Sequence, residues 1–206
     1  MIAATRAATF QDLAQERRSI RHFRSESVPR TVIEEILRAA MWSPSPHNVQ
    51  PWRFTVLVDD ADKDHLAEAM AARLQDDLRD DGVSGEAIAR QTARSRWRLT
   101  TAPVALVCSL VRDGLVEYKD ERRSRFEWEM AVQSVGAVLQ TVFLAAAAHG
   151  LGTCWMAAPM YCPEDVKLAV GLPDPYAPQA LVLMGYPAAP GKIRDRRPFE
   201  EVVEFR

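Results

Sequence analysis

The chain passes from helix to strand within residues 36–54, which read ILRAAMWSPSPHNVQPWRF. Upstream, apolar residues recur at helical spacing from Val32 to Met41, and Pro29 stands where the first turn of a helix tolerates proline. Each proline of the loop disfavours helix in the residue before it, so the helix is expected to end there. The apolar run 52–58 then predicts a strand.

Further elements follow along the chain in both directions. Helices are expected over residues 9–18, 60–80, from beyond Gly82 to Leu99, 124–149 and 163–171, and strands over residues 103–110 and 180–186. Residues 151–156 follow a helix and receive no strand prediction. Helices dominate and the strands are few, which indicates an α+β or α/β sandwich with a central sheet flanked by helices. Residues 1–206 are expected to form one domain.

The composition excludes two classes of partner. A net charge of −2 gives the chain no overall positive field for nucleic acid. The longest apolar run, Val135–Ala148, is shorter than the roughly 20 residues that a membrane-spanning helix needs. We therefore expect this run to be a buried helix, and we expect neither a nucleic acid nor a membrane as partner.

The three cysteines favour a reducing compartment. Cys108, Cys154 and Cys162 are odd in number and form no CxxC motif, which indicates buried or inert thiols in the cytoplasm. The N-terminal residues contain no continuous apolar core of the kind found in a signal peptide. A cytoplasmic protein is the expectation.

A cationic cluster near the N-terminus is a candidate anion site. Arg17, Arg18 and Arg21 offer planar paired donors that match phosphate geometry, and Ser19 adds a hydroxyl. The alternative is a solvated helix end, with the cations at the negative end of the helix dipole. Together with the polar loop of residues 43–54, the cluster points to a planar cofactor that carries a phosphate and supplies the chemistry itself.

Two more arginines stand near the C-terminus. Arg194 and Arg196 alternate, so in an extended segment they project to the same side. They could close the phosphate site from the other end of the chain, or they could be ordinary surface charge.

The loop after the first long helix offers a polar edge. Ser45, His47, Asn48 and Gln50 lie between prolines, and amide side chains carry both a donor and an acceptor, as the edge of a flavin pyrimidine or a nucleobase requires. The alternative is a turn held by local side-chain to backbone bonds. The four histidines show no metal-ligand spacing, so no metal site is expected.

No catalytic side chain is indicated by motif. Residues 150–158 contain GLG but follow a helix, so they do not match the dinucleotide-binding fingerprint, which needs a strand before a helix. Their small residues would let backbone N–H groups approach a ring closely. Ser124 and Cys154 have no evident base partner, and we expect no catalytic residue of the nucleophilic kind.

Five motifs, taken in order, resemble one family over nearly the whole chain. They are RRSIRHF (17–23), the segment 36–54 quoted above, FLAAAAHGLGTCWM (143–156), ALVLMGYP (180–187) and GKIRDRRPFEEV (191–202). Together they resemble the flavin-dependent nitroreductase superfamily. The resemblance implies an α+β three-layer sandwich with a central mixed sheet flanked by helices, an intertwined homodimer, and two FMN sites at its interface.

The resemblance also implies roles for particular residues. Those expected to contact FMN are Arg17, Arg18, Ser19 and Arg21, with Ser45 and Asn48 facing its ring or ribityl chain, Ala157 beside the isoalloxazine, and Arg194 and Arg196 at the phosphate. Hydride transfer would then take place at N5 of FMN. The family usually has a glycine shortly after GLGxCW, whereas this chain has Ala157 and Ala158, which bears on the approach of the backbone to N5.

Three shorter cues resemble the reductase domain that is fused to the ligase building coenzyme F420, a deazaflavin. The cues are PSPHN (44–48), DDLRDDG (76–82) and VRDG (111–114), in a chain without the ligase domain. They imply dehydro-F420-0 as the small-molecule acceptor in coenzyme F420 biosynthesis, with Asp77, Arg96 and Trp97 as candidate substrate-binding residues. The alternatives are a general NAD(P)H-dependent nitroreductase or quinone reductase, a non-catalytic flavin or deazaflavin binding protein, and a structural dimer module.

Overall fold

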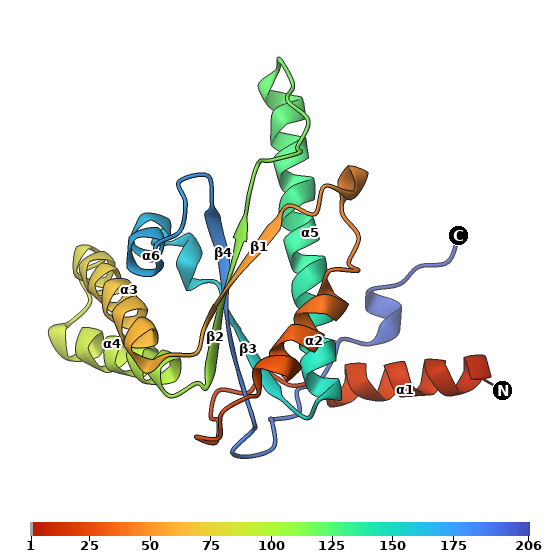
Figure 1. Ribbon diagram of the computed structural model, residues 1–206, viewed down its shortest axis with the longest axis horizontal. Coiled ribbons are helices and arrows are strands. Elements are labelled where there is room, and N and C mark those ends of the chain that lie inside the picture. The colour runs from red at the N-terminus through yellow and green to blue at the C-terminus, as the bar shows by residue number, and fades with distance from the viewer. Residues whose placement is uncertain (1) are drawn as a thin grey trace.

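A four-stranded sheet forms the centre of the computed structural model, which describes residues 2–206 (Figure 1). The strands lie in the order β1-β2-β4-β3, with bounds β1 Trp52–Leu57, β2 Val104–Leu110, β3 Gly152–Met156 and β4 Ala177–Gly185. Six helices surround the sheet in the described residues: α1 Ile2–Glu16, α2 Arg30–Ala40, α3 Asp60–Asp80, α4 Gly85–Thr100, α5 Glu121–Ala148 and α6 Pro163–Val170. Short 3₁₀ turns cover Pro46–Asn48, Ala158–Met160 and Phe199–Glu201.

The sheet corrects the expectation of a mixed sheet. All three strand pairings are antiparallel. The single crossover helix α5 makes β3 run in the same direction as β2, but β4 lies between them, so these two strands never pair. Parallel pairing in the described chain is confined to one isolated bridge, between Ser19 and Thr153.

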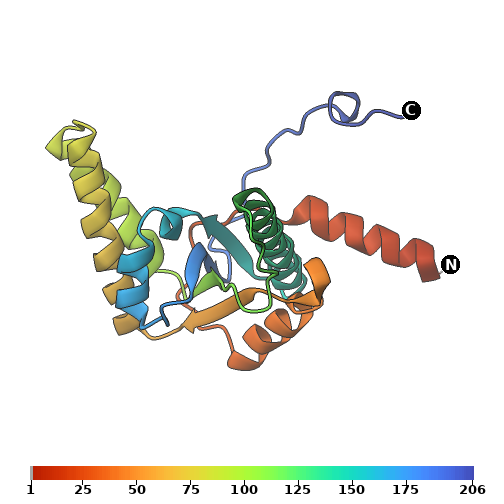
Figure 2. The same cartoon turned by 90° about the horizontal axis from the view of Figure 1, so that it is seen from above.

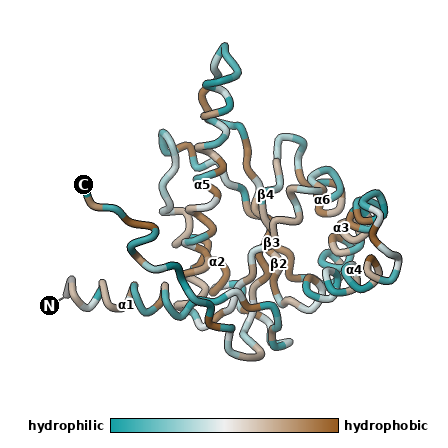
Figure 3. The backbone as a smooth tube through the Cα atoms, turned by 180° about the vertical axis from the view of Figure 1, so that it is seen from behind, coloured by the Kyte–Doolittle hydropathy of each residue, from teal (hydrophilic) through white to brown (hydrophobic). Residues whose placement is uncertain are grey.

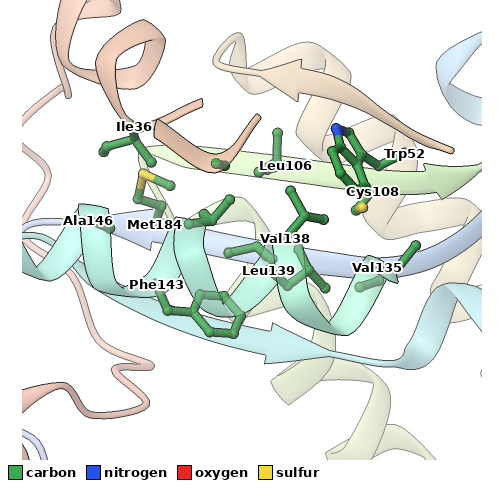
Figure 4. Close-up of a cluster of buried hydrophobic side chains, with 14 of the residues drawn as sticks. Ile36, Trp52, Leu106, Cys108, Val135, Val138, Leu139, Phe143, Ala146 and Met184 are labelled. Atoms are coloured by element: carbon green, nitrogen blue, oxygen red, sulfur yellow. The ribbon is translucent and has the colours of Figure 1, made fainter. Parts of the chain in front are cut away.

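Strand β2 explains the layered architecture. Its residues are all buried, and they alternate between two cores. Leu106, Cys108 and Leu110 pack with α2 and α5, whereas Ala105 and Val107 pack with α3, α4 and α6. Figure 4 shows the first core, where Val135, Val138, Leu139 and Phe143 of α5 face the strands. The expected α+β three-layer sandwich is confirmed.

Strand β3 was not expected from the sequence. It begins two residues after Gly150, which ends α5 with a φ of 73°, and its own first residue is glycine. A Cβ on Gly152 would lie 2.6 Å from Cβ of Ile20, so glycine is needed for the close approach of the N-terminal segment. Strand propensity gives little indication of a short strand that starts with glycine.

The long helix α5 is the one helix of the described residues that has the length and composition to cross a membrane. Its apolar side packs on the sheet: Val138, Leu139 and Val142 are fully buried. The expectation of a buried helix is therefore confirmed only on this side, because 44% of the most apolar 18-residue window is buried. The helix is also longer than predicted, and Asp120 is its N-cap and accepts from Arg123 N.

Two parts of the chain extend away from the sheet on one side, and a helical pair extends on the other. Figure 2 shows α1 and the C-terminal tail leaving the body together, with α3 and α4 opposite them. Figure 3 colours the ends of the tail and of α1 partly apolar. Phe10, Ile193 and Phe205 are 59%, 80% and 86% exposed, so these segments carry apolar side chains without a cover in the chain itself.

Candidate functional site

The cationic N-terminal segment is fixed against β3. Helix α1 ends at Glu16, and the chain then runs extended, with Ile20 N donating to Thr153 O at 2.8 Å. Side chains alternate along this segment: Ile20 is buried under Gly152, while Ser19 and Arg21 are exposed on the other side. The sheet edge therefore presents the polar residues of RRSIRHF outward.

The C-terminal tail returns to this segment. Ala188 N donates to His22 O at 3.0 Å, and Arg24 N donates to Tyr186 O at 2.8 Å. A Cβ on Gly191 would lie 2.7 Å from Cγ of Arg18, so the tail passes directly over that side chain and has no room for a larger residue. This crossing brings the tail arginines beside the N-terminal cluster.

The two segments enclose a cavity of about 850 Å³, called here the cationic cavity. Seven of its lining side chains are cationic and none is a carboxylate. The cationic ones are Arg17, Arg18, Arg21, Arg98, Lys192, Arg194 and Arg196. No ion pair within 4.0 Å involves any of them in the described residues, although the same criterion pairs many arginines elsewhere.

The hydrogen bonds of these arginines go to backbone carbonyls. Arg18 Nη1 donates to the carbonyls of Arg17, at 2.8 Å, and Gln15, and Arg196 Nη1 donates to the carbonyl of Arg194 at 3.2 Å. Arg18 thus caps the end of α1, as the helix-end alternative supposes. Such bonds leave the positive charge without a negative counterpart, so the cavity favours a bound anion.

The loop after α2 holds three non-glycine residues in the left-handed region of backbone conformation. The φ angles are 51° at His47, 56° at Asn48 and 49° at Gln50. Local bonds hold the loop: Gln50 N donates to Ser45 Oγ at 3.0 Å, and Gln50 Nε2 lies 3.4 Å from Asn48 Oδ1. Each such residue costs on the order of 1 kcal/mol, and strain of this kind clusters at functional segments.

This loop lines a different cavity, of about 500 Å³, called here the loop cavity. Its lining residues are Arg38, Met41, Trp42, Ser43, Asn48 and Gln50. It shares no residue with the cationic cavity. Within one chain, the structure therefore keeps Asn48 apart from the arginine cluster, and Ser45 serves as the hydrogen-bond acceptor that shapes the loop.

A family model described as the nitroreductase family matches residues 14–186. The chain belongs to the nitroreductase family. It is 33% identical over 217 residues to an NADH dehydrogenase of Thermus thermophilus, covering 94% of each chain. It is 30% identical to the 5,6-dimethylbenzimidazole synthase of Rhodospirillum rubrum, covering 92% of this chain and 84% of that one. A putative nitroreductase from Desulfovibrio desulfuricans, solved in complex with FMN, matches with a TM-score of 0.72 and 25% identity over 96% of each chain.

Family membership confirms the expectation that the protein is an FMN-dependent oxidoreductase. One departure of this nitroreductase from its family pattern is Ala157, where the family usually has a glycine nearby. Ala157 follows β3 with φ −83° and ψ 1°, which is ordinary backbone for alanine, so the backbone conformation at this point does not require glycine. Ala157 is exposed and does not line the cationic cavity.

Helix α4 brings two further residues of this nitroreductase to the cationic cavity or beside it. Arg98 lines the cationic cavity, and the Trp97 ring lies 5.0 Å from the His22 ring. Burial raises the pKa of the Cys154 thiol, while Arg21 and Arg98 act in the opposite direction, which places both guanidiniums near the same buried sulfur. The charge of Arg98 is evident from the sequence, but its position beside this cavity depends on how α4 docks.

The other two candidate substrate residues of this nitroreductase lie along α3 and α4, away from the cationic cavity. Asp77 Oδ1 lies 2.9 Å from Arg73 Nε, and Arg96 Nη2 lies 3.3 Å from Glu68 Oε1. Neither residue lines the cationic cavity. Of the three candidates, the structure therefore brings only Trp97 beside that cavity.

Proposed function

We propose that the protein binds FMN in the cationic cavity and passes electrons from NAD(P)H through it to a small conjugated acceptor. The observation that carries this proposal is the set of seven cationic side chains that meet there without a carboxylate. A phosphate monoester carries close to two negative charges at neutral pH, and arginines bind it through paired donors. The FMN complex of the relative from Desulfovibrio desulfuricans supports the same choice of cofactor.

Particular residues of this chain would hold the cofactor. Arg17, Arg21 and Arg196 are the phosphate ligands in the proposal, with the Ser19 hydroxyl beside them and Arg98 added from α4. FMN supplies hydride transfer at its N5 atom when it is bound. The protein would supply the position of the cofactor and the hydrogen-bond donors around it.

The cysteines support a reaction carried by the cofactor rather than by a thiol. Burial raises the pKa of Cys108 to about 12 and that of Cys162 to about 11, so both stay protonated near neutral pH. All three cysteines are free and buried. Free thiols of this kind also support the proposed cytoplasmic location.

The proposed active form is a homodimer in which each FMN contacts both copies. Two observations support it. The cationic cavity and the loop cavity share no residue, and an FMN that meets Arg17 of one copy and Asn48 of the other would join the two cavities across the interface. Trp42, which lines the loop cavity, is 91% exposed, and the apolar residues of α1 and the tail are uncovered.

A mixed dimer tests this arrangement. One copy carries Arg17→Ala and the other carries Asn48→Ala, each with its own affinity tag, and the purified mixed dimer is titrated with FMN. If the two residues serve the same ligand from different copies, one site is intact and the other carries both changes. Titration then gives one site of parental affinity per dimer. Two weakened sites, one without Arg17 and one without Asn48, would contradict the proposal, because each site would then draw both residues from one chain.

The reaction is tested on the protein as purified. We expect a visible flavin absorbance band that NADH or NADPH bleaches under anaerobic conditions and that returns when a nitroaromatic or quinone is added. A protein that binds FMN but is not bleached by either nicotinamide would be a carrier. A protein that binds no flavin would overturn the proposal as a whole.

A narrower proposal concerns the acceptor. The cues for coenzyme F420 chemistry favour dehydro-F420-0, and the Trp97 ring beside the cationic cavity could stack on a tricyclic ring. In this narrower proposal the acceptor extends from the cationic cavity along α3 and α4, so Asp77→Ala and Arg96→Ala are expected to weaken binding of this deazaflavin precursor and to leave FMN occupancy unchanged. Arg90→Ala, in an ion pair on the exposed side of α4, is the matched control. Equal turnover of the precursor by all four proteins would favour the general nitroreductase.

A further inference from the structure

A third cavity lies at the far end of α5 from the cationic cavity. The loop 111–120 rises from β2 to the upper end of α5, whereas residues 17–22 and the start of the tail lie at the lower end of the molecule (Figure 1). The loop and the first turns of α5 enclose about 240 Å³. The lining residues are Arg112, Leu115, Val116, Glu117, Tyr118, Ser124, Glu127 and Trp128.

Glu127 is the unusual member of this set, because its carboxylate is buried and only half satisfied. Its side chain lines the cavity although the residue is only 3% exposed. Oε1 accepts from Val116 N at 3.1 Å, whereas Oε2 has no hydrogen-bond partner in the described chain. Buried polar atoms are satisfied in the great majority of cases, so Oε2 calls for a donor from outside the chain.

The nearby guanidiniums do not fill that role. Arg112 lies over the Trp128 ring, 4.4 Å from its centroid, and forms no ion pair within 4.0 Å among the described residues. Arg123 lies over Tyr118 and pairs with Asp120. Both cations are thus stacked on aromatic faces, which leaves the buried carboxylate to a ligand.

The remaining groups define what that ligand can be. The Ser124 hydroxyl donates to the Tyr118 carbonyl at 3.2 Å, so its lone pairs remain available as acceptors. Glu117 adds a second carboxylate at the exposed edge. Leu115 and Trp128 add apolar surface. The lining therefore combines two carboxylates and a hydroxyl with apolar surface and the stacked Arg112, and the volume of about 240 Å³ is below that of typical drug-sized pockets.

We propose that this cavity binds a small organic cation, an ammonium or amidinium group on a compact apolar body, with its N–H donors directed to Glu127. The cavity is separate in place and opposite in charge from the cationic cavity, so the proposal does not rest on FMN binding. The Glu127 carboxylate accepts one backbone hydrogen bond and has one oxygen without a partner in the described chain. A positively charged donor would satisfy that oxygen best, because hydrogen bonds between ionised groups are stronger than those between neutral groups.

The test uses the full-length protein as purified and three probes of the same shape. Benzylammonium carries the donor charge, benzyl alcohol is neutral, and benzoate is an anion. Binding is measured by isothermal titration and by the fluorescence of Trp128 and its neighbours. We expect saturable binding of benzylammonium, at least tenfold tighter than that of benzyl alcohol, and no binding of benzoate.

Glu127→Gln keeps the size of the side chain and an acceptor for Val116 N but replaces the free oxygen with a donor amide. It should weaken benzylammonium binding at least tenfold and leave benzyl alcohol unaffected. Asp113→Asn, on an exposed residue of the same loop outside the cavity lining, is the control for a change of net charge. Equal loss in both variants would overturn the proposal in favour of nonspecific attraction.

A second measurement keeps the proposal testable if Glu127→Gln does not fold. Val116→Trp places bulk at a 41% exposed rim position and keeps the backbone N–H that Glu127 accepts. It should block the probe without unfolding the protein. A crystal structure grown with benzylammonium should show its nitrogen within hydrogen-bond distance of Oε2. A water molecule alone on Oε2 under saturating probe would overturn the proposal.

Discussion

Arginine behaves differently at the cationic cavity and on the helical pair α3–α4. On the helices, arginines meet carboxylates: Arg73 lies 2.9 Å from Asp77, and Arg90 pairs with Glu86 four residues earlier. At the cavity, Arg17, Arg194 and their neighbours meet no carboxylate within 4.0 Å in the described residues. Charges spaced three or four residues apart on a helix neutralise one another. Charges gathered from distant segments without partners indicate a ligand.

The largest expected effect comes from removing one of the unpaired charges. Arg17→Ala or Arg196→Ala should lower FMN affinity about ten- to hundredfold, because each removes a charge-assisted contact of roughly 1.5–3 kcal/mol. Fluorescence titration of the apoprotein measures the change. Arg90→Ala removes an arginine of α4 that already pairs with Glu86, so it should leave FMN affinity unchanged. If both cavity variants purify with full flavin at low protein concentration, the phosphate assignment is wrong.

A smaller effect is expected from the tail crossing that assembles the cavity. Gly191→Ala places a Cβ against Arg18, so the tail must move and the tail arginines with it. Overpacking typically costs about 1–3 kcal/mol. Because the tail is exposed and can shift to relieve part of this cost, we expect FMN affinity to fall by about tenfold or less. Gly85→Ala, where a Cβ would meet nothing within 4 Å, is the matched control on α4. Equal FMN affinity in the two variants would show that the tail does not shape the cavity.

The smallest effect concerns a paired charge and depends on pH. Lys63 Nζ lies 2.9 Å from Asp60 Oδ1 and donates to the Ala102 carbonyl at 2.9 Å. The hydrogen bond from Lys63 holds the pKa of Asp60 below its ordinary value of 3.8. A lowered acid pKa stabilises the fold above the unfolded value, and this stability is lost as pH falls through the folded value.

Asp60→Asn should therefore lower the melting temperature slightly at pH 7, and this difference should shrink as the pH falls below about 4. Thermal unfolding at a series of pH values measures it. A difference that persists unchanged at pH 2 would have to come from packing and not from the ionised pair.

Local patterns in the sequence were enough to predict much of the fold. The spacing of apolar residues and the prolines gave α2, and the apolar runs gave β1, β2 and β4. Strand β3 was not predicted because it follows the end of α5 directly and starts with Gly152, a residue that is uncommon in strands. Its position also depends on packing against Ile20. The prediction of a mixed sheet was wrong because β4 lies between β2 and β3 and pairs antiparallel with both. No local sequence pattern determines this strand order.

For the candidate site too, some features could be predicted from local motifs and others depend on packing. The motifs identified both arginine clusters, and the structure brings Arg17 and Arg196 to one cavity. The sequence could not give the separate position of Asn48, because distance across the fold is a property of packing. The sequence placed Arg98 in a charged segment, residues 70–98, that was expected to contact the substrate, but its position beside the other cavity arginines depends on how α4 docks.

The most direct test of the account compares FMN with riboflavin, which differs only in lacking the phosphate. Apoprotein is titrated with each ligand, for the parent and for Arg17→Ala. If the unpaired cations of the cationic cavity bind a phosphate, the parent should bind FMN at least a hundredfold more tightly than riboflavin, about 2.7 kcal/mol. Arg17→Ala should reduce this ratio and leave riboflavin affinity unchanged. Equal affinity of the parent for both ligands would contradict the account, because the cavity would then recognise no phosphate.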